Sequence, residues 1–87
     1  MPVISTFYGI LIYMYRKNEH NPPHIHAEYG EYTAAFDFEG EIIEGNFPPK
    51  KAKIVTAWII IHREELDAMW KLATMGEILG KIAPLAL

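Results

Sequence analysis

The stretch that decides the fold runs from His24 to Asp37 and reads HIHAEYGEYTAAFD. Polar and apolar side chains alternate before a central Gly30-Glu31 pair. A two-residue turn with glycine in the first central position suits a type II′ hairpin. Because successive side chains point to opposite faces of a strand, the turn also fixes which residues lie opposite each other. The stretch therefore predicts two antiparallel strands joined by this turn.

The predicted register separates an apolar face from a polar one. On the apolar face the turn sets three pairs: Tyr29 with Tyr32, Ala27 with Ala34, and Ile25 with Phe36. On the polar face it sets three others: Glu28 with Thr33, His26 with Ala35, and His24 with Asp37. A hairpin that buries one face requires its apolar residues to coincide in this way. The hairpin thus predicts a polar sheet face that carries two histidines.

Two further strands are predicted, one on each side of the hairpin. Residues 9–16 are apolar on both faces, which is typical of a central strand. Residues 41–45 follow a glycine-containing turn and read as a short strand. If that turn also has two residues, Glu44 lies opposite Ala35, on the same face as His26.

The second half of the chain has helical periodicity over residues 49–75. Pro49 suits the first position of a helix, and Gly76 suits a helix stop. One unbroken helix of this span would be about 40 Å long, so we expect a break near His62. The apolar residues of the segment 76–87 predict a tail that docks back on the domain or on a partner.

These patterns predict a single α+β domain over residues 1–87. It has a small antiparallel β-meander of about four strands in residues 9–45, two helices in residues 49–75 packed on one face, and a docked tail. The chain has no cysteine, which excludes disulfides and thiolate chemistry. The lack of cysteine also fits a reducing cytosol, so we expect a cytoplasmic protein. The apolar run GILIYMY is far too short to span a bilayer, so we expect no membrane contact. The net charge of −3 does not indicate nucleic-acid binding.

Three of the four histidines lie in the segment EHNPPHIHAEYGEY, residues 19–32. His24 and His26 share one strand face in the predicted register, and imidazoles spaced in this way can share one metal ion. His20 is a candidate third ligand, brought over by a loop that the proline pair stiffens. Asp37 is a candidate ligand or an orienting carboxylate. A histidine-rich set of this kind suits a divalent transition metal such as zinc, nickel or iron.

The same residues allow two other interpretations. His24 and His26 could act as general base and general acid without a metal, with Asp37 orienting one of them. Nearby lysines could then hold a phosphate, as in a small ribonuclease. Alternatively, the histidines only line a solvated strand face. His62 lies on the apolar stripe of the helices and is expected to pair with Glu65 rather than to bind a ligand.

A different class of function is a non-catalytic interaction module. The run WIIIH contains three consecutive isoleucines, which cannot all face one stripe of a helix. At least one is therefore expected outside the domain's own core, as part of a partner surface. In this interpretation the isoleucines, Trp58 and the apolar tail bind a small partner protein or a second copy of the chain.

Several segments taken together resemble a known family. They are FYGILIYMY, EHNPPHIHAEYGEY, AFDFEGEIIEG, WIIIHREELDAMW and KIAPL, in this order along the chain. They resemble the bacterial family called domain of unknown function 4160, whose motif histidines match His20, His24, His26 and His62. The resemblance implies a small bacterial protein that is often encoded beside a member of another family, domain of unknown function 2442. It thereby implies one member of a two-gene, toxin–antitoxin-like module, with no established activity.

Overall fold

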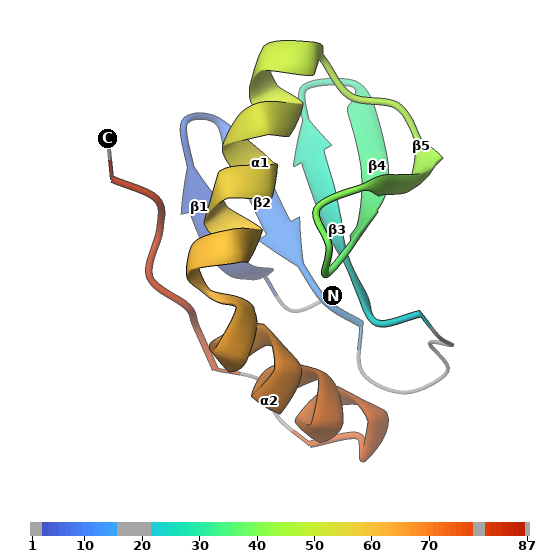
Figure 1. The fold of residues 1–87 in the computed structure, drawn as a ribbon, viewed down its shortest axis with the longest axis vertical. Coiled ribbons are helices and arrows are strands. Elements are labelled where there is room, and N and C mark those ends of the chain that lie inside the picture. The colour runs from blue at the N-terminus through green and yellow to red at the C-terminus, as the bar shows by residue number, and fades with distance from the viewer. Residues whose placement is uncertain (1–2, 16–21, 78–79, 87) are drawn as a thin grey trace.

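The computed structural model describes residues 3–15, 22–77 and 80–86, and it shows an antiparallel sheet followed by two helices (Figure 1). The strands are β1 (Val3–Phe7), β2 (Ile10–Tyr13), β3 (His24–Tyr29), β4 (Tyr32–Asp37) and β5 (Ile42–Gly45). The helices are α1 (Pro49–Ile61) and α2 (Arg63–Thr74). Within the described ranges, the strands β1 to β5 follow chain order across the sheet, so the predicted α+β meander is confirmed.

The hairpin of β3 and β4 has the predicted register at every pair, from His24 opposite Asp37 to Tyr29 opposite Tyr32. Gly30 has a φ of +59°, the positive value that the predicted turn needs at its first central position. The Gly30-Glu31 turn is therefore sufficient to set which side chains of this hairpin share a face.

The beginning of the chain differs from the prediction. The expected strand over residues 9–16 is shorter in the structure, where it begins at Ile10 and ends at Tyr13, and β1 precedes it; residue 16 itself lies outside the described residues. The two strands are joined by a tight turn in which Tyr8 has a φ of 48° and Gly9 a φ of 79°. A bulky residue rarely adopts a positive φ, so this turn has a weak sequence signal. The sheet formed by the described residues consequently has five strands rather than about four.

The second hairpin keeps the predicted position of Glu44, opposite Ala35. Closer to the turn, Phe36 pairs with Ile42, so Ile43 is an extra residue and forms a bulge in β5. The loop is therefore wider than the two-residue turn that was expected.

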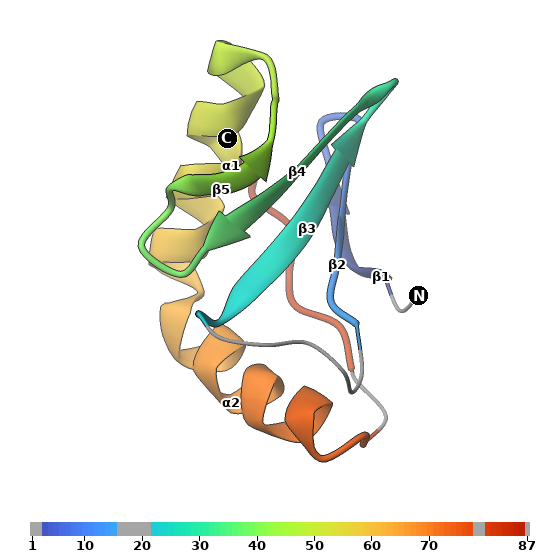
Figure 2. The ribbon, with the colours of Figure 1, turned by 90° about the vertical axis from the view of Figure 1, so that its right-hand side faces the viewer.

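Both helices pack on the apolar side of the sheet. In Figure 2, α1 lies along one face of the sheet and α2 turns under its lower end. The helical segment is interrupted at His62, as predicted. The backbone of His62 leaves the helical conformation, so α1 ends and α2 begins there. The core between the sheet and the helices is filled by fully buried side chains from both layers, among them Ile25, Phe36, Val55, Trp58 and Leu66.

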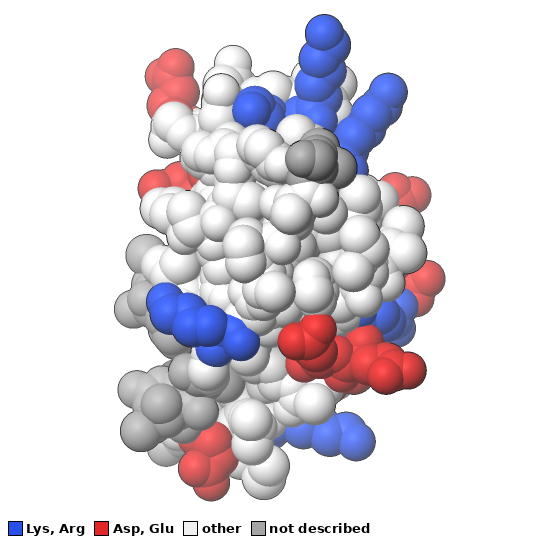
Figure 3. Space-filling view, turned by 90° about the vertical axis from the view of Figure 1, so that its left-hand side faces the viewer, with Lys and Arg blue, Asp and Glu red and all other residues white. Residues whose placement is uncertain are grey.

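The segment after α2 docks on the domain, as expected for the apolar tail. The backbone N–H of Ile82 donates to the carbonyl oxygen of Ile4 at 2.8 Å, on the outer edge of β1. The indole Nε1–H of Trp58 donates to the carbonyl oxygen of Ala83 at 2.9 Å. Figure 3 shows this side of the molecule: charged side chains lie at the top, at the margins and in the lower half, and the centre of the face shows uncharged residues. The tail therefore covers one edge of the sheet.

No helix in the described ranges combines the length and the apolar character that crossing a bilayer requires.

Replacing Gly45 by alanine is expected to destabilise the fold by about 2–4 kcal/mol. Gly45 has a φ of +80°, and a Cβ atom there would lie 2.4 Å from the carbonyl oxygen of Thr33. The backbone of β4 would have to move, which breaks the pairing that places Glu44. Urea unfolding followed by circular dichroism measures the loss.

Gly30→Ala is the matched control for this substitution. Gly30 also has a positive φ, but a Cβ atom there would meet nothing within 4 Å. We expect it to cost only about 1 kcal/mol, the penalty of the backbone conformation alone. Equal losses for the two variants would show that the contact with Thr33 does not matter.

Candidate functional site

The face of the sheet opposite the helices carries a row of registered residues. Tyr13 pairs with His26, His26 with Ala35, and Ala35 with Glu44, so the row crosses β2, β3, β4 and β5. Because paired residues point to the same side of a sheet, all four side chains share this face. Ala35 is the smallest of them, and it lies between the imidazole and the carboxylate.

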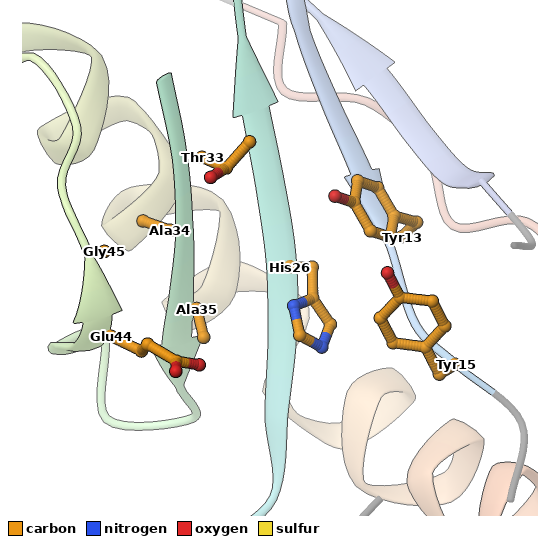
Figure 4. A pocket seen from close by; sticks show the side chains of 8 residues that line it. All are labelled: Tyr13, Tyr15, His26, Thr33, Ala34, Ala35, Glu44 and Gly45. Carbon is orange, nitrogen blue, oxygen red and sulfur yellow. The ribbon is translucent and has the colours of Figure 1, made fainter. Parts of the chain in front are cut away.

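A hollow of about 240 Å³ lies over this row. It is lined by Tyr13, Tyr15, His26, Thr33, Ala34, Ala35, Glu44 and Gly45 (Figure 4). Figure 4 shows the carboxylate of Glu44 directed below Ala35 on one side, and the imidazole of His26 with the ring of Tyr15 on the other. The small side chain of Ala35 leaves the space between them.

The two strand histidines lie side by side. The ring centroids of His24 and His26 are 5.1 Å apart, and the ring planes are inclined by 74°. Imidazoles that share one tetrahedral zinc ion hold it at about 2.0–2.1 Å, which places their ring centroids about 5 Å apart. The spacing of the two rings therefore suits one shared metal ion.

The orientation of the His24 ring is fixed by the backbone. Its Nδ1 lies 2.7 Å from the carbonyl oxygen of Pro22. A carbonyl oxygen can only accept, so Nδ1 carries the hydrogen and Nε2 carries the lone pair of the neutral ring. His24 is also buried, with 6% of its surface exposed, and the centroid of its ring lies 5.3 Å from that of the Trp70 ring. Metal-binding histidines commonly donate their other ring N–H to a carbonyl in this way.

His26 lies between two tyrosines. Its ring stacks on the ring of Tyr13, with the two centroids 5.6 Å apart. It forms an edge-to-face contact with the ring of Tyr15, with the centroids 4.6 Å apart. Burial, and then the nearby Tyr15 and Glu28, raise the pKa of Tyr13 above its ordinary value. The Tyr13 hydroxyl is therefore protonated at neutral pH, and it shares a hydrogen bond with the hydroxyl of Tyr15.

The charge around the hollow favours a cation. Glu44 is the one formally charged side chain among the described residues that line it, and no lysine or arginine belongs to that set. Lys51 is engaged elsewhere: its Nζ donates to the carbonyl oxygen of Tyr8 at 3.2 Å and lies 4.9 Å from the centre of the Tyr29 ring. Tyr29 belongs to the opposite face of the hairpin from His26. Among the described residues, an anion in the hollow would therefore meet a carboxylate rather than an ammonium group.

Asp37 lies opposite His24, as the register predicts, but its carboxylate serves the turn. Its Oδ1 accepts the backbone N–H groups of Glu39 and Glu41, each at 2.9 Å. The contact that orients the His24 ring comes from Pro22, where Asp37 was expected. The catalytic role of Asp37 stays a prediction.

His20, the expected third ligand, lies outside the described residues. Within the described ranges, no group of three or more histidine, cysteine, aspartate or glutamate side chains converges as a metal site. The structure thus brings together His24 and His26 of the predicted ligand set. His62 pairs with Glu65 as predicted, with 2.6 Å between Nδ1 and Oε1, and its ring lies 5.4 Å from Trp58.

Sequence reasoning missed the two tyrosines of the hollow. Tyr13 and Tyr15 alternate with the core residues Ile12 and Met14, and this alternation is the signal that places the two tyrosines together on the other face of the strand. The segment was interpreted as apolar on both faces because tyrosine was counted with the apolar residues. Glu44 was correctly placed on the His26 face but was not included in the site.

The fold and the site define an α+β domain whose polar sheet face carries one buried and one half-buried histidine beside a polar hollow. A family model described as "Domain of unknown function (DUF4160)" matches residues 9–71, and the chain belongs to this family. The resemblance of the sequence motifs is thereby confirmed. No curated protein and no solved structure matches the chain.

Proposed function

We propose that this protein binds a divalent transition metal through the imidazoles of His24 and His26. The observation that carries the proposal is the pair of rings 5.1 Å apart, one of them held by its Nδ1–H on the carbonyl oxygen of Pro22. A ring that is already fixed loses little side-chain entropy when it binds an ion. Glu44, across Ala35, adds a negative charge to the surroundings of the site.

The ion is of the zinc, nickel or iron type rather than calcium or magnesium. Two neutral imidazoles are nitrogen ligands, which these transition metals favour, whereas calcium and magnesium favour oxygen ligands. An ion of this type needs further ligands, and catalytic metal sites take water or substrate in such a position. His20 stays a sequence-based candidate for one of these positions.

The same geometry is less favourable for the phosphate-binding and ribonuclease alternatives. Phosphate would approach a hollow whose charged lining residue is Glu44, while Lys51 lies at the turn between β1 and β2. Like charges in partly buried surroundings repel, so the electrostatic balance favours a cation.

The biological setting that we propose follows from the family. The protein would be a small cytoplasmic bacterial member of a two-gene, toxin–antitoxin-like module, and the metal site would be its functional centre. Support for this setting comes only from the resemblance of this chain to the family, whereas the metal proposal rests on the geometry of the site.

A metal titration of chelator-treated protein tests the proposal. Zinc or nickel at a hundred times the dissociation constant adds about 2.7 kcal/mol of stability. For a domain of this size, this raises the unfolding temperature by about 10 °C or more. Calcium, magnesium and inorganic phosphate are the controls and are expected to leave it unchanged. If the two rings are only packed edge to face, zinc and nickel will leave it unchanged as well.

A further inference from the structure

A second recessed surface lies on the other side of the sheet, between the β4–β5 hairpin and α1. This groove, of about 590 Å³, is lined by Phe36, Gly40, Glu41, Ile42, Ala52, Lys53, Thr56, Ala57 and Ile60. The Thr56 hydroxyl donates to the carbonyl oxygen of Gly40 at 2.9 Å and holds the two walls together. Apart from Thr56 and two charged residues, the lining is apolar or glycine.

The groove is bordered by exposed isoleucines. Ile60 of α1 is 67% exposed and Ile42 of β5 is 40% exposed. The opposite edge of the sheet is covered by the C-terminal tail. The tail pairs with β1 through Ile82 and buries its own apolar side chains there. Among the described residues, the chain therefore covers one edge of the sheet and leaves apolar surface open at the other. A cluster of this kind marks an interaction site.

The charges of the groove indicate what covers it. Glu41 belongs to the hairpin wall and Lys53 to the helix wall, and neither forms an ion pair with a described residue. A twofold axis through the groove would exchange the walls, so that Glu41 of each copy faces Lys53 of the other across the apolar centre. Symmetric dimers use the same self-complementary patch on both subunits.

The bulge at Ile43 decides between two ways of pairing. Pairing of β5 with β5 of a second copy would need a regular strand edge, and a bulge in a strand of four residues interrupts it. Packing of Ile60 into the groove needs no strand pairing. We propose that this groove is the contact surface of a homodimer, with Ile60 of each copy seated in the groove of the other and Glu41 paired with Lys53.

Sedimentation velocity over a range of concentrations tests the dimer. The mass obtained from the sedimentation of the wild-type protein is expected to be twice the chain mass of 10.0 kDa. Ile60→Lys is expected to weaken the dimer by at least about tenfold, because it places a charge in the apolar centre. Ile61→Lys is the matched control: Ile61 is 63% exposed on the same helix but does not line the groove. It is expected to leave the dimer unchanged.

Charge reversal identifies the occupant as a second copy. Glu41→Lys and Lys53→Glu are each expected to weaken the dimer, and the two substitutions together are expected to restore it. Failure of the double variant to recover would overturn the proposed pairing. A wild-type protein that is monomeric at every concentration would overturn the dimer, even if Ile60→Lys disrupted a complex with a different protein. Circular dichroism of each variant confirms that it is folded.

Discussion

Replacing His24 and His26 together by alanine is expected to abolish the binding of zinc and nickel. The described part of the site has two imidazoles that we propose as ligands, and removing both leaves Glu44 as the one charged side chain among the described residues that line the hollow. A single carboxylate holds a transition metal weakly in water, since affinity depends on the number and type of ligands. Isothermal titration with zinc should then detect no binding at concentrations that saturate the wild-type protein.

Two further variants separate the loss of a ligand from a loss of folding. His24 packs on Trp70 and is held by Pro22, so its replacement also removes packing. His26→Ala alone keeps these contacts and is expected to weaken zinc binding by at least about tenfold, because losing even a residue that only orients a ligand costs about 10–100-fold in affinity. His62→Ala is the matched control, because His62 pairs with Glu65 away from the site. Equal affinity of His26→Ala and wild type would contradict the proposal.

Replacing Trp58 by alanine is expected to have the largest effect on stability, a loss of about 3–5 kcal/mol. Trp58 is fully buried, its ring lies 5.5 Å from that of Phe7, and its indole N–H holds the tail at Ala83. A domain of this size has a total stability of about 5–15 kcal/mol, so the variant is expected to lie close to unfolding. Urea unfolding measures the loss.

Trp58→Phe separates the packing of the ring from its hydrogen bond. It keeps an aromatic side chain and leaves the carbonyl oxygen of Ala83 without its donor, at an expected cost of about 1–3 kcal/mol. The amide of Ile82 should exchange faster with solvent in this variant, because the tail is held less firmly to Ile4. Unchanged exchange at Ile82 would show that the indole does not anchor the tail.

Local turn chemistry explains which parts of the fold could be predicted. Gly30 fixes a two-residue turn, and the turn fixes the register of every residue from His24 to Asp37. The turn at Tyr8 was missed because a tyrosine with a positive φ departs from the usual residue preferences. β1 was missed with it.

Strand register predicts which residues of the site share a face of the sheet, but it does not predict the contacts of their side chains. Register places His26, Ala35 and Glu44 on one face, but it does not show that the small Ala35 leaves a hollow between the other two. It places Asp37 opposite His24, but it does not show that a carboxylate near a loop can bind backbone N–H groups instead. The carbonyl of Pro22, which orients His24, carries no signal in the sequence because every residue has one.

The exposed isoleucines illustrate a third limit. Periodicity shows that three consecutive isoleucines cannot all be buried, and the structure assigns Ile59 to the core and Ile60 and Ile61 to the surface. The groove beside Ile60 exists because the β4–β5 loop reaches back to Thr56. Contacts of this kind depend on the path of a loop, which the pattern of the sequence does not determine.

A crystal of the protein soaked in zinc and measured at the zinc absorption edge tests the central claim most directly. We expect an anomalous peak between the two rings, about 2.0–2.1 Å from Nε2 of His24 and from one ring nitrogen of His26. No peak at saturating zinc, or peaks bound only to other side chains, would contradict the assignment of His24 and His26 as metal ligands.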